Sequence, residues 1–143
     1  MKLCHLLCGI FCLLFLLLAN ADDTAGVPLK VEGIKGSYPA SAAITVKVSN
    51  VTQGLVVYGL GIQMQTSEGW RDFMTNIDDP APDHMEFKLR KIGAGKTQTL
   101  TWQPKLVPKM YGPINGTYRV YFIWNADPSD HKKFYSVPFK IEE

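Results

Sequence analysis

The chain has no cysteine beyond its first dozen residues. All three cysteines lie in one apolar N-terminal segment, as Cys4, Cys8 and Cys12. This segment has the features of a secretory signal peptide: Lys2 gives a basic start, residues 3–18 are apolar except for His5 and Gly9, and Ala19-Asn20-Ala21 is a small-residue cleavage pattern. We therefore predict a signal peptide over residues 1–21 and an exported chain without a disulfide, a thiolate nucleophile or a cysteine-based metal site. An uncleaved membrane anchor is the alternative, although the run is slightly shorter than the ~20 residues a spanning helix needs.

After this segment the chain has neither a large excess of one sign of charge nor another long apolar run. After residue 21 the chain has 14 basic and 13 acidic residues, because the leader removes only Lys2. This near balance argues against a nucleic-acid partner and against a polybasic membrane surface. No later segment is apolar enough to span a bilayer. We expect a short flexible arm at residues 22–27 and one domain at residues 28–143, which is long enough to bury a core.

Helical periodicity is absent as well, and alternation with period two takes its place. Ile44, Val46 and Val48 alternate with polar residues in one such segment. Alternation of this kind predicts strands at residues 41–49, 54–66, 70–74, 85–90, 97–102, 116–125 and 133–141. In the last segment the alternation aligns Tyr135, Val137, Phe139 and Ile141 on one face. Pro138 cannot donate to a ladder, so this strand is expected at an edge or to be locally bulged. About seven to eight short strands predict an all-β domain, either a sandwich or a barrel.

One local pattern favours the sandwich. The segment Asn115-Gly116-Thr117-Tyr118-Arg119-Val120 has the form of a tyrosine corner, in which a tyrosine hydroxyl binds upstream backbone. The second cysteine of an immunoglobulin disulfide would lie two residues after the tyrosine, and Val120 occupies that position here. The predicted fold is therefore an immunoglobulin-like antiparallel β-sandwich without a disulfide.

The order of several motifs resembles cysteine-free bacterial immunoglobulin-like domains of exported proteins. The matching segments are residues 43–50, Tyr58-Gly59, Gly69-Trp70-Arg71-Asp72-Phe73, residues 93–102, Tyr111-Gly112 and residues 116–120. The resemblance covers roughly residues 40–142 and extends to some bacterial proteinase-inhibitor sandwiches. It implies a secreted or periplasmic protein that binds another protein or an envelope component, and it brings no catalytic motif. An exported hydrolase inhibitor is the alternative, with residues 80–84 and 104–113 as its candidate loops.

Candidate chemistry is sparse. His84 and His131 each lie beside acidic residues, which suits a cation site, but ordinary solvated turns explain the same composition. Ser129, Asp130 and His131 are consecutive, which is poor geometry for a catalytic triad. A metal-dependent enzyme is therefore the least favoured function, and we expect no catalytic, cofactor or metal residues. Asn50-Val51-Thr52 and Asn115-Gly116-Thr117 are glycosylation sequons that matter only in a eukaryotic source.

Aromatic and aliphatic residues that face away from the predicted core suggest a partner surface. Tyr121 and Ile123 face outward on one strand, and Leu55 and Val57 on another. If those strands are neighbours, they form an exposed apolar patch, and such patches mark interaction sites. Equally, the long proline-rich connection could cover this face. Trp70 is the candidate for an exposed aromatic platform, because the period places Trp102 and Trp124 inward.

Overall fold

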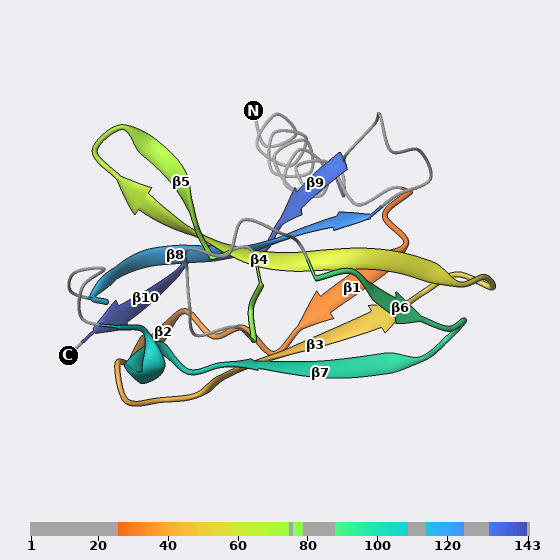
Figure 1. The fold of residues 1–143 in the computed structure, drawn as a ribbon, viewed down its shortest axis with the longest axis horizontal. Coiled ribbons are helices and arrows are strands. Elements are labelled where there is room, and N and C mark those ends of the chain that lie inside the picture. The colour runs from red at the N-terminus through yellow and green to blue at the C-terminus, as the bar shows by residue number, and fades with distance from the viewer. Residues whose placement is uncertain (1–25, 75, 79–87, 109–113, 125–131, 143) are drawn as a thin grey trace, which may run out of the picture.

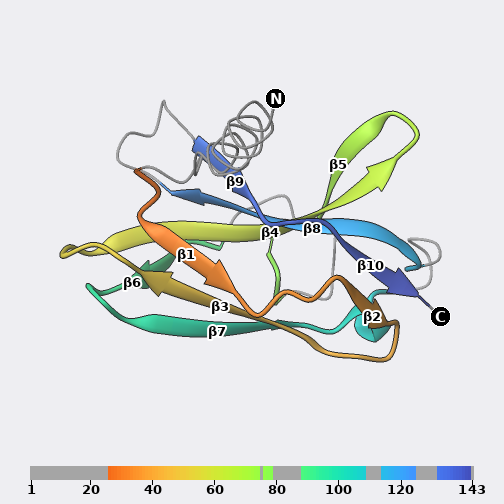
Figure 2. The same ribbon diagram turned by 180° about the vertical axis from the view of Figure 1, so that it is seen from behind.

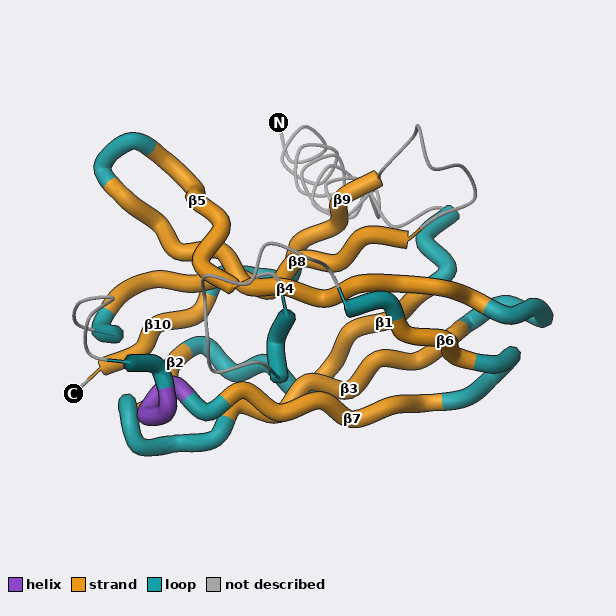
Figure 3. Tube along the Cα trace, in the orientation of Figure 1, coloured by secondary structure: helices purple, strands orange, loops and turns teal. Residues whose placement is uncertain are grey.

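The computed structural model describes residues 26–74, 76–78, 88–108, 114–124 and 132–142. These residues form ten β-strands and one short 3-10 helix, η1 (Pro104–Leu106). Strands dominate the tube in Figure 3, as period-two alternation predicted. No cysteine lies in the described part of the chain, so no disulfide contributes to the stability of that part.

The strands form two sheets packed face to face (Figure 1). The smaller sheet has the order β1-β3-β7, with β1 (Leu29–Glu32), β3 (Ile44–Asn50) and β7 (Thr97–Trp102). The larger sheet has the order β2-β10-β8-β4-β5, with β2 (Ser37–Pro39), β10 (Phe139–Glu142), β8 (Gly116–Trp124), β4 (Val56–Thr66) and β5 (Gly69–Met74). Beside these, β6 (Arg90–Ile92) pairs with β4 and β9 (Lys132–Tyr135) pairs with β8. The predicted immunoglobulin-like sandwich is confirmed.

Two strands that sequence reasoning did not predict, β1 and β2, divide the first part of the domain between the sheets. The segment β1 pairs with β3, whereas β2 pairs with β10 as the one parallel ladder among the described strands. Gly33 lies where the chain crosses between the sheets and has a φ of 92°. A Cβ at this position would lie 2.9 Å from the carbonyl oxygen of Thr45, so the crossover requires glycine.

The core lies between the sheets and follows the predicted alternation. Ile44, Val46 and Val48 of β3 are fully buried against the inner face of β4 and β8. Trp102 is buried as expected, and its ring lies 5.3 Å from that of Tyr118. Trp124 is only partly buried and packs on Phe134, with 4.2 Å between ring centroids.

The tyrosine corner is present. The Tyr118 hydroxyl donates a 2.8 Å hydrogen bond to the carbonyl oxygen of Ile114, four residues upstream. Burial raises the pKa of Tyr118 to about 12, so the hydroxyl keeps its proton at physiological pH. Its ring also stacks on Phe139 of β10 at 6.2 Å. Tyr118 therefore joins the loop before β8 to the end of the chain.

The last predicted strand, residues 133–141, is interrupted. Tyr135 lies opposite Tyr121, but Phe139, four residues further on, lies opposite Tyr118, only three residues away. One extra residue is therefore inserted, which is the bulge that Pro138 suggested. The hydroxyl of Ser136 accepts the Val120 N–H at 3.0 Å and restores that ladder contact. The expectation that Tyr135 and Phe139 share one face is therefore wrong. The inserted residue separates them, and Tyr135 is 44% exposed whereas Phe139 is buried.

Asn50 is buried at the end of β3 and has a structural role. Its side-chain amide donates to the carbonyl oxygens of Gly54 and Ile92 at 2.7 and 3.0 Å. Its Oδ1 accepts the Thr52 N–H at 2.8 Å, which forms an Asx turn. All of its hydrogen-bonding groups are used, so a glycan at this sequon is incompatible with the folded domain.

The outer face of the larger sheet, the one turned away from the smaller sheet, is closely packed around Gly61. A Cβ at this position would lie 2.6 Å from the Met74 carbonyl oxygen and 2.7 Å from the Tyr121 ring. The missing side chain is thus what allows Tyr121 to lie flat across β4. Glycine is therefore required at position 61 of β4, because the backbone of Met74 and the ring of Tyr121 approach it closely.

Replacing Tyr118 by Phe removes one hydrogen bond and leaves the Ile114 carbonyl without it. We expect a loss of about 1 kcal/mol in the free energy of unfolding, measured by urea denaturation. The control is Tyr135→Phe, whose hydroxyl makes no hydrogen bond to a described residue and whose removal should change stability by less than ~0.5 kcal/mol. Equal effects of the two variants would contradict the tyrosine corner.

Replacing Gly61 by Ala forces a methyl group into the space occupied by Met74 and Tyr121. The expected destabilisation is roughly 1–3 kcal/mol, the usual cost of overpacking. Gly54→Ala is the matched control, because nothing lies within 4 Å of its Cβ position and its φ is not positive. Thermal unfolding of both variants checks the difference, and a neutral Gly61→Ala would show that Tyr121 is not held against β4.

Candidate functional site

The structure corrects one residue of the expected partner surface. The strands β4 and β8 are neighbours, with Gly61 opposite Tyr121, so the outward-facing residues do share one face. Tyr121, however, is fully buried. Among its neighbours is Lys133 of β9, whose Nζ lies 5.1 Å from the centre of the Tyr121 ring. Tyr121 cannot touch a partner directly, and the Tyr121 pKa is raised by burial and then by the charges of Asp72 and Tyr135.

The other residues expected on that surface fall into two groups, because Trp70 lies far from the other three. Val57 and Ile123 are half-buried diagonal neighbours, because Ile123 pairs with Gly59, and Leu55 is 64% exposed just before β4. Trp70 pairs with Gln65 near the other end of β4. Eight residues of strand separate Val57 from Gln65, which is roughly 25 Å. These residues therefore do not form one continuous apolar patch, and a partner surface built on them stays a prediction.

Trp70 belongs instead to a stack on the outer face, which we call the Arg119 stack (Trp70, Arg119 and Tyr135). The guanidinium carbon of Arg119 lies 3.7 Å from the centre of the Tyr135 ring and 4.3 Å from that of Trp70. Both distances are within the range of cation–π attraction. The rings come from β5 and β9, which both rise from the outer face in Figures 1 and 2.

A short hydrogen-bonded chain fixes the orientation of the guanidinium. Arg119 Nε donates to Gln63 Oε1 at 2.9 Å, and Gln63 Nε2 donates to Asp72 Oδ1 at 2.8 Å. Asp72 also lies 3.9 Å from Lys133 Nζ. Gln63 is buried, so this chain is shielded from water over part of its length. Burial lowers the pKa of Arg119 and the charge of Tyr135 opposes this, but an arginine remains cationic in either case.

Sequence reasoning missed Arg119 because a single outward-facing arginine on a strand is ordinarily a solvated residue. One signal was available: Trp70 and Arg119 fall on the same face once β4 is paired with both β5 and β8. That pairing could not be read from the sequence. The segment that supplies Tyr135 was assigned the wrong register, which placed Tyr135 with the core residues.

A second feature, which we call the seam groove, lies between the edges of the two sheets. It has a volume of about 600 Å³ and lies between β1 and β9. Its apolar lining includes Leu29, Val31, Ile34, Phe122, Phe134 and Val137. Lys30, Glu32 and Tyr135, which point to the opposite faces of their strands, line it as well, so the groove runs along both strand edges. Sequence reasoning missed this feature because β1 was not predicted.

His84 and His131, the residues considered for a cation site, lie outside the described residues. Within the described residues no cluster of three His, Cys, Asp or Glu side chains could hold a metal ion. Of the inhibitor loops, residues 80–84 and 109–113 also lie outside, while Pro104–Leu106 forms η1. In the described segments no helix is long and apolar enough to cross a bilayer.

Comparisons with known proteins identify the fold but not a family. No family model matches the chain, and no curated protein sequence matches it. Among solved structures, the chain is similar to part of the pre-assembly complex of chaperone CsuC and tip adhesion subunit CsuE from archaic Csu pili of Acinetobacter baumannii. The TM-score is 0.50 at 16% identity, over 79% of this chain and 55% of that one. The chain thus spans about half the length of this neighbour.

Two further similarities are weaker. A chain of the Salmonella enterica SafA pilin in complex with the SafB chaperone gives a TM-score of 0.47 at 12% identity, covering 79% of this chain and 52% of that one. A β-glucosidase from Erythrobacter marinus gives 0.38 at 14% identity, over 80% of this chain and 15% of the enzyme. At these identities the similarities concern the fold alone, and the fold is that of an immunoglobulin-like β-sandwich.

Proposed function

We propose that this protein is a non-enzymatic, extracytoplasmic binding domain that holds an extended segment of another protein in the seam groove. The observation that carries the proposal is the position of the groove between two strand edges. The N-terminal leader motivates the location, and the sequence offers no catalytic constellation. The similarity to part of a chaperone–subunit complex gives one precedent for protein binding by this fold.

The backbone along the groove has hydrogen-bonding capacity to offer. Within the described residues β1 pairs only with β3, and β9 pairs only with β8. Each strand therefore leaves one row of N–H and C=O groups without a ladder partner. An extended peptide can add to such an edge through main-chain hydrogen bonds. Both strands have only four residues, which suits a short added strand.

The side chains of the groove define the chemistry of the occupant. Val137 and Val51 are 69% and 58% exposed and lie at its rim, while Leu29 and Phe122 lie buried at its base. An apolar base with an aliphatic rim favours a segment whose alternate residues are apolar, because every second side chain of an added strand points inward. Lys30 and Glu32 pair with each other at 2.9 Å, so the β1 rim has no excess charge.

The test selects linear peptides from a displayed random library on the wild-type domain. We expect selected peptides with alternating apolar residues that bind Val137→Asp at least tenfold more weakly, because the new carboxylate must be desolvated. Leu55→Asp is the matched control: it charges an equally exposed aliphatic residue outside the groove and should bind normally. Both substitutions are at exposed positions and should leave the melting temperature nearly unchanged.

Amide hydrogen exchange locates the peptide independently. Binding should slow exchange in β1 and β9 specifically, because their free edges become paired. Peptides that bind Val137→Asp as well as wild type, or that lose binding in Leu55→Asp, would overturn the groove as the site. A concentration-dependent dimer that resists the peptides would instead identify a second copy of the chain as the occupant and would also overturn the proposal.

A further inference from the structure

Arg119 carries a positive charge that no acid in the described structure neutralises. The ion pairs among the described side chains involve Asp78, Glu32 and Asp72, and none includes Arg119. Asp72, although nearby, is engaged by Gln63 and lies 3.9 Å from Lys133. Arg119 and Lys133 are thus two cations that lie near the single carboxylate of Asp72.

The guanidinium of Arg119 is also incompletely hydrogen-bonded. Its single hydrogen bond to a described residue is the one from Nε to Gln63. Among the described residues the two terminal amino groups have no acceptor, so they can donate to a ligand. A guanidinium presents these donors as a planar fork, which matches the two oxygens of a carboxylate.

The rings on either side determine how a ligand can approach. The ring centroids of Trp70 and Tyr135 lie 4.3 and 3.7 Å from the guanidinium carbon. Trp70 comes from β5 and Tyr135 from β9, on either side of the β4–β8 pair, so we infer that the rings cover opposite faces of the guanidinium. A ligand must then approach in the plane of the guanidinium, where a flat acceptor with two oxygens fits best. The same stacking occupies one face of the Trp70 ring, which argues against Trp70 as an open platform for a sugar.

We propose that the Arg119 stack is a binding site for a carboxylate, held by the two terminal amino groups of Arg119 between the rings of Trp70 and Tyr135. Gln63 orients the guanidinium before the ligand arrives, so little conformational freedom is lost on binding. A carboxylate suits the site better than a phosphate, because Asp72 nearby repels a dianion more strongly than a monoanion. This site depends on its own geometry and does not require an occupied seam groove.

The carboxylate can come from a chain terminus or from an acidic side chain, and the test separates these sources. The Arg119 Nε–Hε and Trp70 indole signals are followed by NMR at pH 6.5 and constant ionic strength. The probes are sodium acetate, a tetraglycine peptide with a free C-terminus, its C-terminal amide, and a capped glutamate. We expect saturable shifts with the three carboxylates, in the millimolar range, and none with the amide. A preference for the peptide or for the capped glutamate identifies the source.

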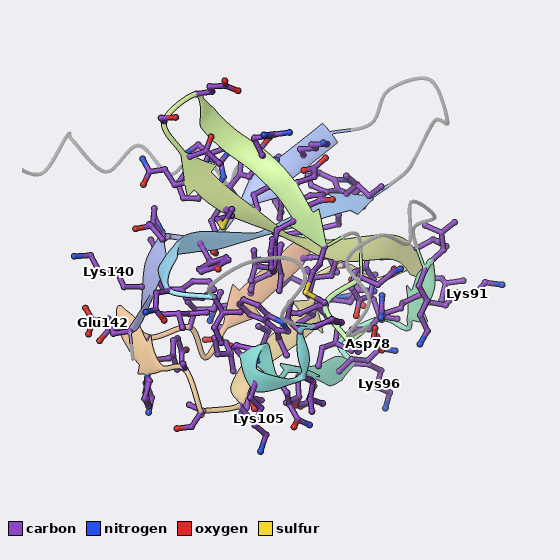
Figure 4. All side chains as sticks on the ribbon, turned by 60° about the vertical axis from the view of Figure 1, so that its left-hand side comes forward. Asp78, Lys91, Lys96, Lys105, Lys140 and Glu142 are labelled. Atoms are coloured by element: carbon purple, nitrogen blue, oxygen red, sulfur yellow. The ribbon has the colours of Figure 1, made fainter. Side chains whose placement is uncertain are left out.

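Substitutions of Arg119 test whether these chemical-shift changes depend on its two terminal amino groups. Arg119→Gln should abolish binding. Arg119→Lys keeps the charge but not the planar fork, and it should weaken binding at least fivefold. Binding to both variants is followed by the Trp70 indole signal, and their folding is checked by the melting temperature. Lys105→Gln is the charge-matched control, because Lys105 is exposed on η1, which follows β7 of the smaller sheet (Figure 4). Equal shifts in Arg119→Gln, no saturable shift with acetate, or tighter binding of inorganic phosphate would each overturn the proposal.

Discussion

The pairing of β4 with β8 is the interaction on which the rest of this structure depends. Seven consecutive residue pairs join the two strands, from Tyr58 opposite Trp124 to Met64 opposite Tyr118. Every other strand of the larger sheet except β2 adds directly to one of these two. One side of the ladder supplies the core, and the other side supplies Gln63 and Arg119. Because side chains alternate along a strand, a slip of one residue would exchange these two sets and destroy both.

The sequence predicted the orientation of side chains correctly where one face of a strand is buried and the other is exposed to solvent. In β3 and β8 the alternation identified the inward residues correctly, and the tyrosine corner identified the sandwich. It was uninformative for β1 and β2, because four- and three-residue strands are too short to show a period. Both candidate sites depend on such tertiary features: the seam groove needs β1, and the Arg119 stack needs the register of β9. The burial of Tyr121 could not be predicted either, because it depends on contacts with other strands, such as the close approach of its ring to Gly61 of β4.

The strand β9 connects the two candidate sites. Phe134 faces inward and lines the seam groove, while Tyr135 faces outward and stacks on Arg119. The bulge at Ser136 makes this possible, since it shifts the register between β9 and β10 by one residue. Without the insertion, Tyr135 would share a face with Phe139 and point into the core. One inserted residue therefore places an aromatic side chain at the boundary of both sites.

The burial of Asn50 has a consequence for how the protein can be produced. Oligosaccharide transfer in a eukaryotic secretory pathway acts on nascent chains, before the side chain of Asn50 is enclosed. A sugar on its amide nitrogen would remove one of the two donors that bind Gly54 and Ile92, and it would not fit between those carbonyl groups. Chains modified at this sequon would be diverted to quality control rather than folded. A bacterial host, or an Asn50-Val51-Thr52 sequence altered at Thr52, avoids that loss, at the cost of the Thr52 hydroxyl bond to Asn50 in the altered case.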